Sequence, residues 1–443
     1  MSLRPLRTIE EAAEAAAGAA KGFAESSRLP AHARAKALLH VSEGLAGRKE
    51  ELARLVTEEV GKPLKEARRE LDRAIFTFRW ASEEAQRFGG EWLPLDLDAN
   101  GEGRLAIVRR FPRGPCLFIT PFNFPVNLVA HKVAPAMAVG ASFVLKPAPQ
   151  APKVAGVLAE LLRESGYPEA ASTVCPCPNE VAEALVKDGR FAVLSFTGSA
   201  AVGWKLRALA AKKQVLLELG GNGCVVIGPD ADLPWAAARC AWGAFYYSGQ
   251  VCISVQRIIA HETVFARFKD LFLKNVAELK VGEPSDEHTD VGPLIDDRAA
   301  ERVESWVAEA AAGGGRVILG GKRTGRLLPP TLVEEPPQTC KLAREEAFGP
   351  VATLEKVATL ELAFDRVAAS AYGLQAGLFT RDIGVILRAW ERLPVGGLIV
   401  NDIPSYRSEA MPYGGNRDSG IGREGVRYAM EEFTEPRTLV LRS

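Results

Sequence analysis

Short, continuous apolar segments alternate with amphipathic segments through the middle of the chain. Each apolar segment has the length of a buried strand, and polar and apolar positions at helical spacing follow it. The four expected strands cover residues 116–120, 143–145, 192–196 and 215–217. The helices expected after the first three strands run to about residue 138, over 151–165 and over 200–210. This alternation predicts a parallel sheet that helices cover on both faces.

Before this region the pattern is helical throughout. Thr8 and Glu11 have the spacing of a capping box, and an alanine-rich helix is expected to follow to about Phe23. Further helices are expected after residue 30, over 48–60 and over 64–88. Their amphipathic pattern indicates a scaffold, and no residue in them points to chemistry.

A second region with the same alternation begins after Gly221. An apolar strand is expected at 224–227, an apolar helix at 233–247, and a β-branched strand at 253–259. Further helices are expected at 264–278 and 298–312, and strands from 351 and at 396–400, before a loop over 401–425. The chain therefore predicts two α/β domains.

Two short segments stand apart from both domains. Residues 104–108 alternate weakly between apolar and polar, and residues 438–441 near the end of the chain do the same. Two such strands can pair and project as an arm, and the open edge of an arm invites pairing with another subunit. We therefore expect a β-strand arm that mediates oligomerisation.

One small or polar residue follows each expected strand of the first sheet: Asn123, Lys146, Gly198 and Glu218. Ligands of parallel sheets bind beyond the carboxyl ends of the strands. Asn123 could cap a helix rather than hold an oxyanion, and Lys146 could be solvated rather than bind ribose hydroxyls. Gly198 could simply begin a helix, since the GxGxxG fingerprint is absent, and Glu218 could be held by backbone amides rather than act as a base. Their shared position is the reason to expect a site.

Cys252 lies at the junction between the expected helix at 233–247 and the strand after it. Gly249, just before it, allows a sharp turn, so the thiol can point into a cleft and act as a nucleophile. Free cysteine is also among the most buried residue types and usually acts as a small hydrophobe. On the residues alone, both interpretations stay open.

The composition narrows the class of protein. The chain has 443 residues, 47% hydrophobic and 25% charged, and its 55 basic residues balance 55 acidic ones. Bulk charge therefore gives no reason to expect nucleic-acid or membrane binding. No apolar run is long enough to span a membrane, and the first residues lack the order of a signal peptide, so a cytoplasmic protein is expected. Cys175 and Cys177 have no second cysteine pair or histidine cluster nearby, so no metal site is expected.

Seven motifs in a fixed order carry a resemblance to a known family. They are ITPFNFP, LKPAP, FTGS, LELGG, SGQVCIS, EEAFGPV and MPYGGNRDSGIGREG. This set, which spans Ile119 to Gly425, resembles the NAD(P)-dependent aldehyde dehydrogenase superfamily. The resemblance implies an aldehyde dehydrogenase-like α/β fold. Its parts would be a Rossmann-type NAD(P)-binding domain at 1–91 and 114–219, an α/β catalytic domain at 220–428, and an oligomerisation arm at 92–113 and 429–443.

The resemblance also implies a role for individual residues. Cys252 matches the nucleophile, Glu218 the general base, and Asn123 the amide that forms the oxyanion hole with the backbone N–H of Cys252. The implied contacts of NAD or NADP are Thr120, Pro121, Phe122, Lys146, Pro149, Phe196, Gly198, Ser199, Val202, Leu219, Glu346 and Phe348. Family members specific for NAD often carry a glutamate where this chain has Pro149, so NADP is expected to be accepted.

By this resemblance the chain oxidises a small aldehyde, including aldehydes with an anionic tail, to the carboxylic acid through a thiohemiacetal and a thioester. The motifs are similar to those of lactaldehyde, phosphonoacetaldehyde and semialdehyde dehydrogenases. Arg407 is expected at the substrate mouth, where it could hold the tail or only pair with Glu409, and His131 could face the same tunnel or merely pack. A homodimer or homotetramer is expected. The alternatives are a cysteine hydrolase or acyltransferase without nicotinamide, and a catalytically silent family member.

Overall fold

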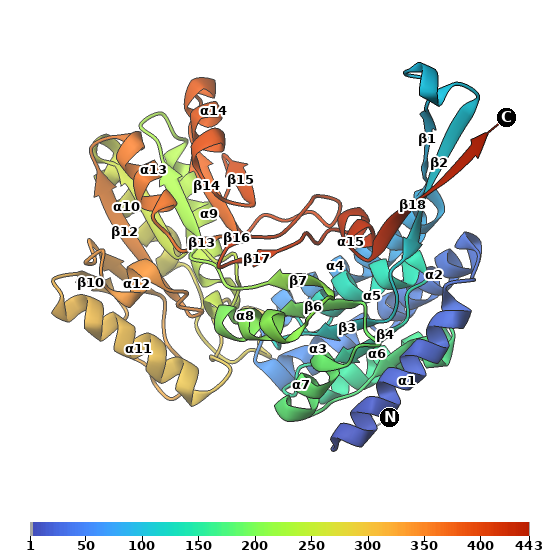
Figure 1. Cartoon of the computed structure of the whole chain (residues 1–443). Helices are drawn as coiled ribbons and strands as arrows, with labels where there is room; N and C mark the ends of the chain where they lie inside the picture. Colours follow the sequence, from blue (N-terminus) through green and yellow to red (C-terminus); the bar gives the residue numbers. More distant parts are fainter. Residues whose placement is uncertain (1–2, 443) are drawn as a thin grey trace.

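The computed structural model describes residues 3–442, and it shows two α/β units and a projecting arm (Figure 1). The first unit holds a six-stranded sheet in the order β17-β7-β6-β3-β4-β5. Its strands are β3 (Cys116–Ile119), β4 (Phe143–Lys146), β5 (Ser172–Val174), β6 (Val193–Thr197), β7 (Gln214–Glu218) and β17 (Gly420–Ile421). All neighbours are parallel except β17 and β7. The four predicted strands are confirmed, whereas β5 and β17, of three and two residues, are too short to leave a pattern.

Helices cover both faces of this sheet, as predicted. In β3, Cys116 and Phe118 pack into one buried cluster, and Leu117 and Ile119 pack into another on the opposite face. The helices of the first unit are α1 (Ile9–Ser26), α2 (Ala31–Gly47), α3 (Lys49–Val60), α4 (Leu64–Arg87), α5 (Asn127–Val139), α6 (Pro152–Glu164), α7 (Asn179–Lys187), α8 (Ala200–Leu209) and α15 (Val426–Glu432). A short turn, η2 (Glu169–Ala171), precedes β5. The capping box at Thr8 and Glu11 is confirmed.

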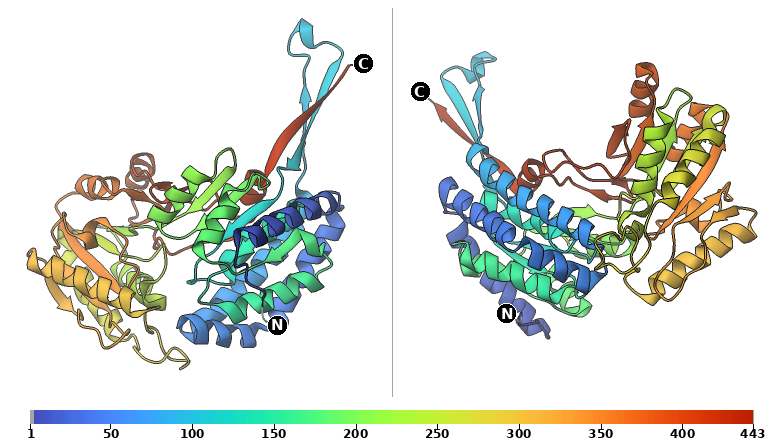
Figure 2. Two further views of the ribbon diagram at one scale, coloured as in Figure 1. Left: turned by 60° about the horizontal axis from the view of Figure 1, so that its bottom comes forward. Right: turned by 180° about the vertical axis from the view of Figure 1, so that it is seen from behind.

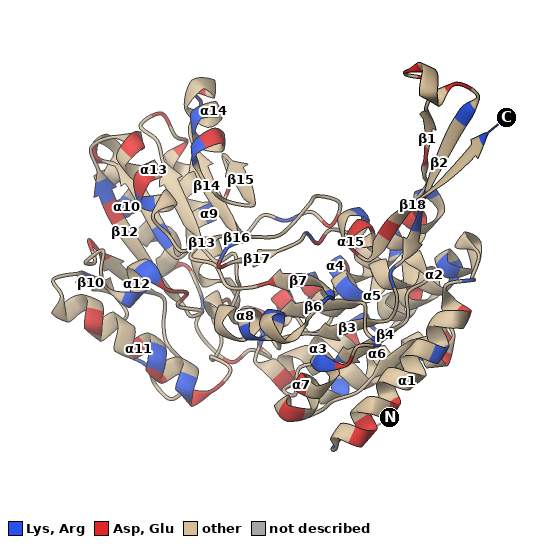
Figure 3. Ribbon diagram, viewed as in Figure 1, with Lys and Arg blue, Asp and Glu red and all other residues tan. Residues whose placement is uncertain are grey.

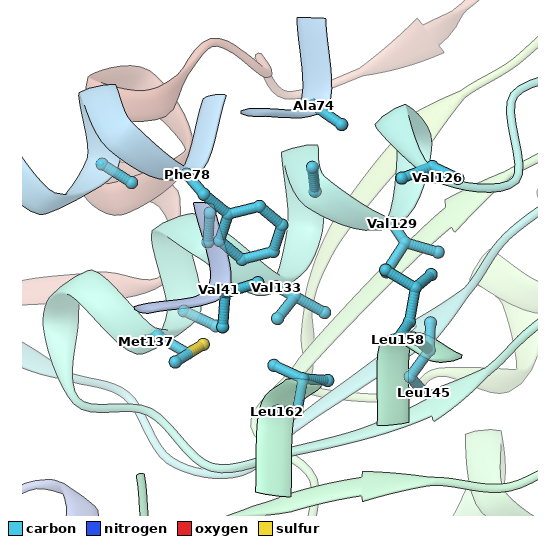
Figure 4. Packing of buried hydrophobic residues seen from close by; sticks show 14 of the residues in the cluster. Val41, Ala74, Phe78, Val126, Val129, Val133, Met137, Leu145, Leu158 and Leu162 are labelled. Atoms are coloured by element: carbon cyan, nitrogen blue, oxygen red, sulfur yellow. The ribbon is translucent and has the colours of Figure 1, made fainter. Parts of the chain in front are cut away.

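The larger cluster fixes α4 in place. Figure 4 shows the ring of Phe78, on α4, beside Val41 of α2 and Val133 of α5, and all three are buried. Burying a side chain of this kind contributes about 1.5–3 kcal/mol. Because α4 is held along its length by α2 and α5, polar residues on its buried face are held as well.

The second unit holds a seven-stranded sheet in the order β10-β11-β12-β9-β8-β14-β15, in which only β10 runs antiparallel to its neighbour. Its strands are β8 (Cys224–Ile227), β9 (Arg257–His261), β10 (Arg316–Leu319), β11 (Thr331–Glu334), β12 (Val351–Val357), β14 (Gln375–Phe379) and β15 (Gly397–Val400). Its helices are α9 (Leu233–Phe245), α10 (Glu262–Ala277), α11 (Asp297–Ala312), α12 (Lys341–Arg344), α13 (Leu360–Ala368) and α14 (Ile383–Arg392). The predicted helices at 264–278 and 298–312 and the predicted strands at 224–227, from 351 and at 396–400 are confirmed. The sequence pattern misses β10, β11, β14, α12, α13 and α14 here and α7 and α15 in the first unit.

Two predicted boundaries around Cys252 are wrong. Helix α9 ends at Phe245 and is followed by the short turn η3 (Tyr246–Gly249), and strand β9 begins only at Arg257. Val255 donates its N–H to Gly243 O, at the end of α9, instead of to a neighbouring strand. Ile253 and Val255, the β-branched residues of this segment, are buried without forming a strand.

The arm is a three-stranded antiparallel sheet in the order β1-β2-β18 (Figure 2). Its elements are β1 (Glu91–Pro94), η1 (Ala99–Gly101), β2 (Arg104–Pro112) and β18 (Thr434–Arg442). The predicted pairing of the two isolated segments is confirmed, and both strands are longer than expected. The arm projects from the first unit in both views, and it exposes apolar side chains, among them Trp92, Leu97 and Leu439.

The chain returns from the second unit to the first before it ends. After β15, residues 401–425 run as an extended loop with a minor sheet, β13 (Tyr372–Gly373) with β16 (Asn416–Arg417). Strand β17 then pairs with β7, and α15 packs against α4 and α5. Residues 420–421 and 426–432, which lie near the expected end of the catalytic domain at residue 428, thus pack with the first unit.

Charged residues of both signs are interspersed over both units (Figure 3), in keeping with the balanced composition. Within residues 3–442, no helix combines the length and the apolar character needed to cross a membrane.

Candidate active site

A cavity of about 500 Å³ lies between the two units, and residues of both line it. Its walls include these predicted site residues: Pro121, Phe122, Asn123, Gly198, Ser199, Glu218, Leu219, Cys252, Glu346, Phe348 and Arg407. The remaining predicted residues, Thr120, Lys146, Pro149, Phe196, Val202 and His131, do not line it. Lys146 ends β4 beside the end of β3, whereas Pro149 and Val202 are exposed. The cavity therefore brings together Asn123 and Glu218, which follow strands of the first sheet, and Cys252 from the second unit.

A strained turn presents Cys252 to this cavity. Tyr247 and Ser248 have left-handed backbone conformations, with φ of 47° and 54°, and Gly249 follows with φ of 67°. A Cβ on Gly249 would lie 2.1 Å from Gly349 O, so only glycine fits. Ser248 Oγ donates to Gly292 O at 2.7 Å, which holds the turn. The sequence indicated the glycine, but not the two left-handed residues before it.

Asn123 contacts the same turn. Its Nδ2 donates to Gln250 O at 3.0 Å, and its Oδ1 is buried without a hydrogen-bond partner in the described part of the chain. A side-chain amide has two N–H donors, so one remains for a ligand in the cavity. The residue therefore joins the loop after β3 to the turn that carries Cys252, and it does not cap a helix.

A buried ion pair contacts both the loop that carries Asn123 and the turn before Cys252. Lys62 and Glu70 are both inaccessible to solvent and form a salt bridge. Glu70 Oε1 accepts the N–H groups of Val126 and Asn127 at 2.8 and 3.0 Å, next to Asn123 in the chain. Lys62 Nζ lies 3.7 Å from the centre of the Phe124 ring, and it also faces Tyr247. The pair thus contacts both the loop of Asn123 and the turn of Cys252.

Glu218 is the last residue of β7, and its carboxyl group faces the cavity. Burial, and then the neighbouring Glu424, raise the pKa of Glu218 well above its ordinary value. Its Oε2 is buried, and none of the residues 3–442 donates a hydrogen bond to it. A carboxyl group with a raised pKa and a free oxygen suits proton transfer with water.

Cys252 is a protonated thiol at rest. Burial raises the pKa of Cys252 to about 12, although a contact with the hydroxyl of Tyr413 acts to lower it. Tyr413 Oη lies 3.2 Å from Cys252 Sγ. The thiol must therefore lose a proton before it can act as a nucleophile.

A network of charged side chains lies behind the cavity wall and reaches the cavity through Arg407 and Arg73. Arg407 Nη2 lies 3.1 Å from Glu424 Oε2, and Lys132 Nζ lies 3.0 Å from Glu424 Oε1. Burial acts to raise the pKa of Glu424, but Lys132 and Arg407 outweigh it and lower this pKa to about 2. Glu424 is therefore ionised at neutral pH, and Arg407 is held by a charged partner while it lines the cavity.

Glu409 forms the second half of the network. It binds Arg73 Nε at 2.5 Å and lies 2.5 Å from His131 Nε2 and 3.8 Å from Arg407 Nε. His131 is fully buried and does not line the cavity, which agrees with a ring that packs in the interior rather than one that faces the tunnel. Burial, and then Arg407, lower the pKa of His131, which suits a neutral ring beside the carboxylate of Glu409. His131 instead contacts Glu409, and the alternative pairing of Arg407 with Glu409 is present only at the longer distance of 3.8 Å.

The N-terminus of α8 opens into the cavity, where Gly198 and Ser199 line the wall with Ala200 and Ala201. Ser199, at the N-cap, makes no side-chain hydrogen bond to the helix, so the first N–H groups of α8 are left for an anion. A Cβ on Gly198 would lie 2.5 Å from the Phe196 ring, which requires glycine there. These residues fit the pyrophosphate of a dinucleotide.

Glu346 and Phe348 lie on the wall of the same cavity. Gly221 donates its N–H to Glu346 Oε1 at 3.0 Å, and burial raises the pKa of Glu346 to about 7. Phe348 meets Phe122 edge to face, with ring centres 6.1 Å apart. A carboxylate and two aromatic rings at this position suit ribose hydroxyls and a flat heterocycle.

Comparison with known proteins agrees with this geometry. The sequence model of the aldehyde dehydrogenase family matches residues 4–439. The chain belongs to this family. Together with its named relatives, this makes the protein an NAD(P)-dependent aldehyde dehydrogenase, which oxidises an aldehyde to the carboxylic acid.

Several relatives of this aldehyde dehydrogenase have names or solved structures. It is 42% identical over 409 residues to 3-sulfolactaldehyde dehydrogenase of Priestia aryabhattai, a match covering 92% of this chain and 86% of the other. Aldehyde dehydrogenase 21 of Physcomitrella patens, in complex with the reaction product succinate, superposes with a TM-score of 0.95 at 43% identity, covering 98% of this chain and 91% of that one. Glyceraldehyde-3-phosphate dehydrogenase of Methanocaldococcus jannaschii, complexed with NADP, superposes with a TM-score of 0.94 at 37% identity, covering 100% and 96%.

These matches bear on the two alternatives left by the sequence. A hydrolase without nicotinamide would have no use for the open N-terminus of α8 or for Glu346. A silent member of the family would not need the thiol, and this aldehyde dehydrogenase keeps Cys252 on the cavity wall. Neither alternative is favoured.

Several cavity residues of this aldehyde dehydrogenase were missed by sequence reasoning. Arg73 lies on α4, which the sequence pattern indicated as scaffold only, and Tyr413 lies in a motif whose tyrosine was given no role. A signal for α4 existed, because Glu66, Glu70, Arg73 and Thr77 recur at helical spacing on one face that also carries apolar residues. No local signal marks Tyr413, since its hydroxyl meets a sulfur 161 positions away.

Proposed function

We propose that Cys252, Asn123 and Glu218 carry out the oxidation. The thiolate of Cys252 attacks the aldehyde carbon and forms a thiohemiacetal. The free N–H of the Asn123 amide and the backbone N–H of Cys252 hold the oxyanion, and each such donor contributes about 3 kcal/mol to the transition state. A nicotinamide held near Phe122 and Phe348 supplies the hydride acceptor when the cofactor is bound.

Glu218 then acts on the thioester that remains on Cys252. It takes a proton from a water molecule, and the resulting hydroxide attacks the thioester carbon. The C–S bond breaks, the carboxylic acid leaves, and the thiolate is restored. The single observation that carries this assignment is the convergence of an unpartnered carboxyl, a free amide donor and a thiol on one cavity wall.

Two variants test the assignment by their different kinetics. Cys252→Ala should abolish reduced-cofactor production from an aldehyde, whereas Cys340→Ala, which changes a buried cysteine outside the cavity, should retain it. Glu218→Gln should give a pre-steady-state burst of reduced cofactor followed by slow turnover. Retained oxidation in Cys252→Ala would refute the nucleophile, and complete loss of the burst in Glu218→Gln would mean that Glu218 acts earlier.

For the substrate, we infer a small aldehyde with an anionic tail. Arg73 and Arg407 both line the cavity, and Arg73 Nη2 is buried with no hydrogen-bond partner among the residues that the structure describes. In the network, Arg73, Arg407 and Lys132 face the ionised Glu409 and Glu424, so one positive charge is in excess. A guanidinium with a free N–H, in a network that carries one positive charge in excess, binds a carboxylate, phosphate or sulfonate well.

The relatives are consistent with such a tail. Their names include 3-sulfolactaldehyde, sulfoacetaldehyde and aspartate-semialdehyde dehydrogenases, and one solved structure holds succinate. Lactaldehyde dehydrogenases are also among them, so the charge of the tail is a proposal that needs its own experiment.

A substrate panel tests the tail. It compares succinic semialdehyde, glyceraldehyde 3-phosphate, phosphonoacetaldehyde, lactaldehyde and simple alkanals. Arg407→Ala and Arg73→Ala should raise KM for the charged aldehydes by about tenfold or more, as expected for loss of a charge-assisted hydrogen bond, and leave KM for alkanals nearly unchanged. Because Arg407 also favours the thiolate of Cys252, Arg407→Ala should in addition lower kcat for all aldehydes alike. Arg69→Ala is the matched control, since Arg69 lies one turn earlier on α4, is exposed and does not line the cavity. An equal rise in KM for charged and neutral aldehydes would rule out these arginines as the binding site of an anionic tail.

We also propose that NADP is accepted. Pro149 is exposed after β4 and carries no charge that would repel a 2′-phosphate. Measured kcat/KM should therefore differ by much less than a thousandfold between NAD and NADP. A larger preference for NAD would mean that another residue excludes the phosphate.

The arm supports a proposal about assembly and compartment. We infer a homodimer or homotetramer, because the outer edge of β1, or that of β18, and the apolar side chains Trp92, Leu97 and Leu439 are open to a second copy. Sedimentation should show no stable monomer at micromolar concentration. We further infer a cytoplasmic enzyme, since all seven cysteines are free thiols and catalysis by a thiol suits a reducing compartment.

A further inference from the structure

The hydroxyl of Tyr413 is fixed against the reacting sulfur. Its Oη lies 3.2 Å from Cys252 Sγ, and this sulfur is its one hydrogen-bond partner among residues 3–442. The backbone of Tyr413 exchanges two hydrogen bonds with Glu424, so the ring cannot easily swing away. The side chain is 3% exposed and lines the cavity beside Cys252.

Arg407 covers the ring of Tyr413. The guanidinium carbon lies 3.7 Å from the ring centre, and Glu424 holds the guanidinium from the other side. A cation on the face of a phenol withdraws electron density from the ring and strengthens the O–H as a donor. Burial raises the pKa of Tyr413 well above its ordinary value, so the phenol keeps its proton at neutral pH.

We propose that Tyr413 is a catalytic residue that donates a hydrogen bond to the thiolate of Cys252. The proposal rests on the assignment of Cys252 as the nucleophile. In the resting thiol either atom can donate, but once the thiol proton has left to water only the phenol can. The same O–H receives the thiolate again when the C–S bond of the thioester breaks. Tyr413 keeps its own proton in both steps, so no further reactant is needed.

The surroundings of Cys252 show why such a donor matters. Burial opposes the thiolate, and the carboxyl groups of Glu346 and Glu218 oppose it further when they are ionised, whereas Arg407 favours it. The hydroxyl of Tyr413 is the hydrogen-bond donor that favours the charged sulfur. A phenylalanine would fill the same space without this effect, so the isosteric variant separates packing from chemistry.

The test measures the reactivity of the thiol without substrate or cofactor. Wild type and Tyr413→Phe are alkylated with iodoacetamide over a range of pH, and mass spectrometry follows the label on Cys252. The alkylation rate of Tyr413→Phe at pH 7 should be roughly 10- to 100-fold lower, with the profile moved to higher pH, as expected for one lost hydrogen bond to a charged group. The kcat for aldehydes should fall, while KM for NADP stays unchanged.

Two further proteins keep the test decisive. Tyr167→Phe removes an equally buried hydroxyl, which donates to Ala141 O far from the site, and it should leave the alkylation profile unchanged. A difluorotyrosine at position 413 keeps the shape but donates more strongly, so it should move the profile to lower pH. An unchanged profile in both position-413 proteins would overturn the proposal. Aldehyde oxidation in Cys252→Ala would instead refute the nucleophile, which is a separate result.

Discussion

The buried pair of Lys62 and Glu70 gives the sharpest prediction about how the site is held. Both side chains are inaccessible to solvent, and Glu70 also accepts two backbone N–H groups beside Asn123. Removing one partner of a buried ion pair leaves an uncompensated charge and costs about 3–5 kcal/mol, whereas replacing both partners is often nearly neutral. Lys62→Met should therefore be strongly destabilised, because the carboxylate of Glu70 is left alone.

The double variant Lys62→Met with Glu70→Gln should recover most of that loss. Glutamine keeps an oxygen that can accept the N–H groups of Val126 and Asn127, and it leaves no charge buried. Each backbone hydrogen bond to a neutral acceptor is weaker, by about 1 kcal/mol, than one to a carboxylate. The loop of Asn123 is thus held less firmly, and kcat should stay below that of the wild type even though stability returns.

Urea unfolding followed by circular dichroism, and steady-state kinetics, measure the two effects in the four proteins of this cycle. Stability in the double variant should exceed that of Lys62→Met by roughly 2 kcal/mol or more. If the double variant instead loses the sum of the two single losses, the residues act independently and the reasoning fails. Full recovery of kcat would show that the pair only stabilises the fold.

Three other outcomes follow from individual groups. Because burial raises the pKa of Glu346 to about 7, its carboxyl group ionises as pH rises through neutrality, so NADP should bind more tightly at pH 8 than at pH 6. In Glu346→Gln the Kd for NADP, measured by fluorescence titration, should not change with pH. A Kd that still changes between pH 6 and pH 8 in this variant would contradict the prediction. Gly249→Ala should reduce kcat by at least about tenfold, because the added Cβ would meet Gly349 O. Gly166→Ala is the control: Gly166 has φ of 80°, but a Cβ there would have no neighbouring atom within 4 Å, so the variant should lose only about 1 kcal/mol of unfolding free energy. Lys132 and Arg407 lower the pKa of Glu424 from its ordinary value of 4.5 to about 2 in the folded protein, so the stability that this carboxylate provides is complete above about pH 5 and is lost on acidification toward pH 2. The thermal unfolding temperature of Glu424→Gln should therefore depend less on pH between 5 and 2 than that of the wild type. An equal dependence in the two proteins would refute this assignment.

The core of the fold was predictable because its signals are local. The strands that end near Asn123 and Glu218 are short apolar segments followed by amphipathic helices, and that pattern needs no distant partner. The capping box at Thr8 and Glu11 is local for the same reason. Family motifs then supplied the roles of Cys252, Asn123 and Glu218, which the cavity brings together.

What escaped prediction depends on contacts between distant segments. Ile253 and Val255 alternate with polar residues as in a strand, but this segment packs beside α9, so buried positions here have the same sequence pattern as a strand. The polar face of α4 looked like a solvated scaffold until its position under the loop of Asn123 was known. His131 could face the tunnel or pack, because one-dimensional spacing does not distinguish the two directions, and its ring lies beside Glu409 in the interior.

The return of residues 401–432 to the first unit has a consequence for the order in which the enzyme is made. Protein synthesis runs from the N-terminus, so Asn123, Glu218 and Cys252 have all left the ribosome before this segment exists. Until it appears, β7 has an open edge where β17 will pair, and α5 lacks the cover of α15. The sulfur of Cys252 meanwhile lacks both the phenol and the guanidinium that arrive with the same segment. A nascent chain therefore carries Cys252, Asn123 and Glu218 through much of its synthesis without a complete cavity, and their surroundings are complete only when residues 401–432 pack against the first unit.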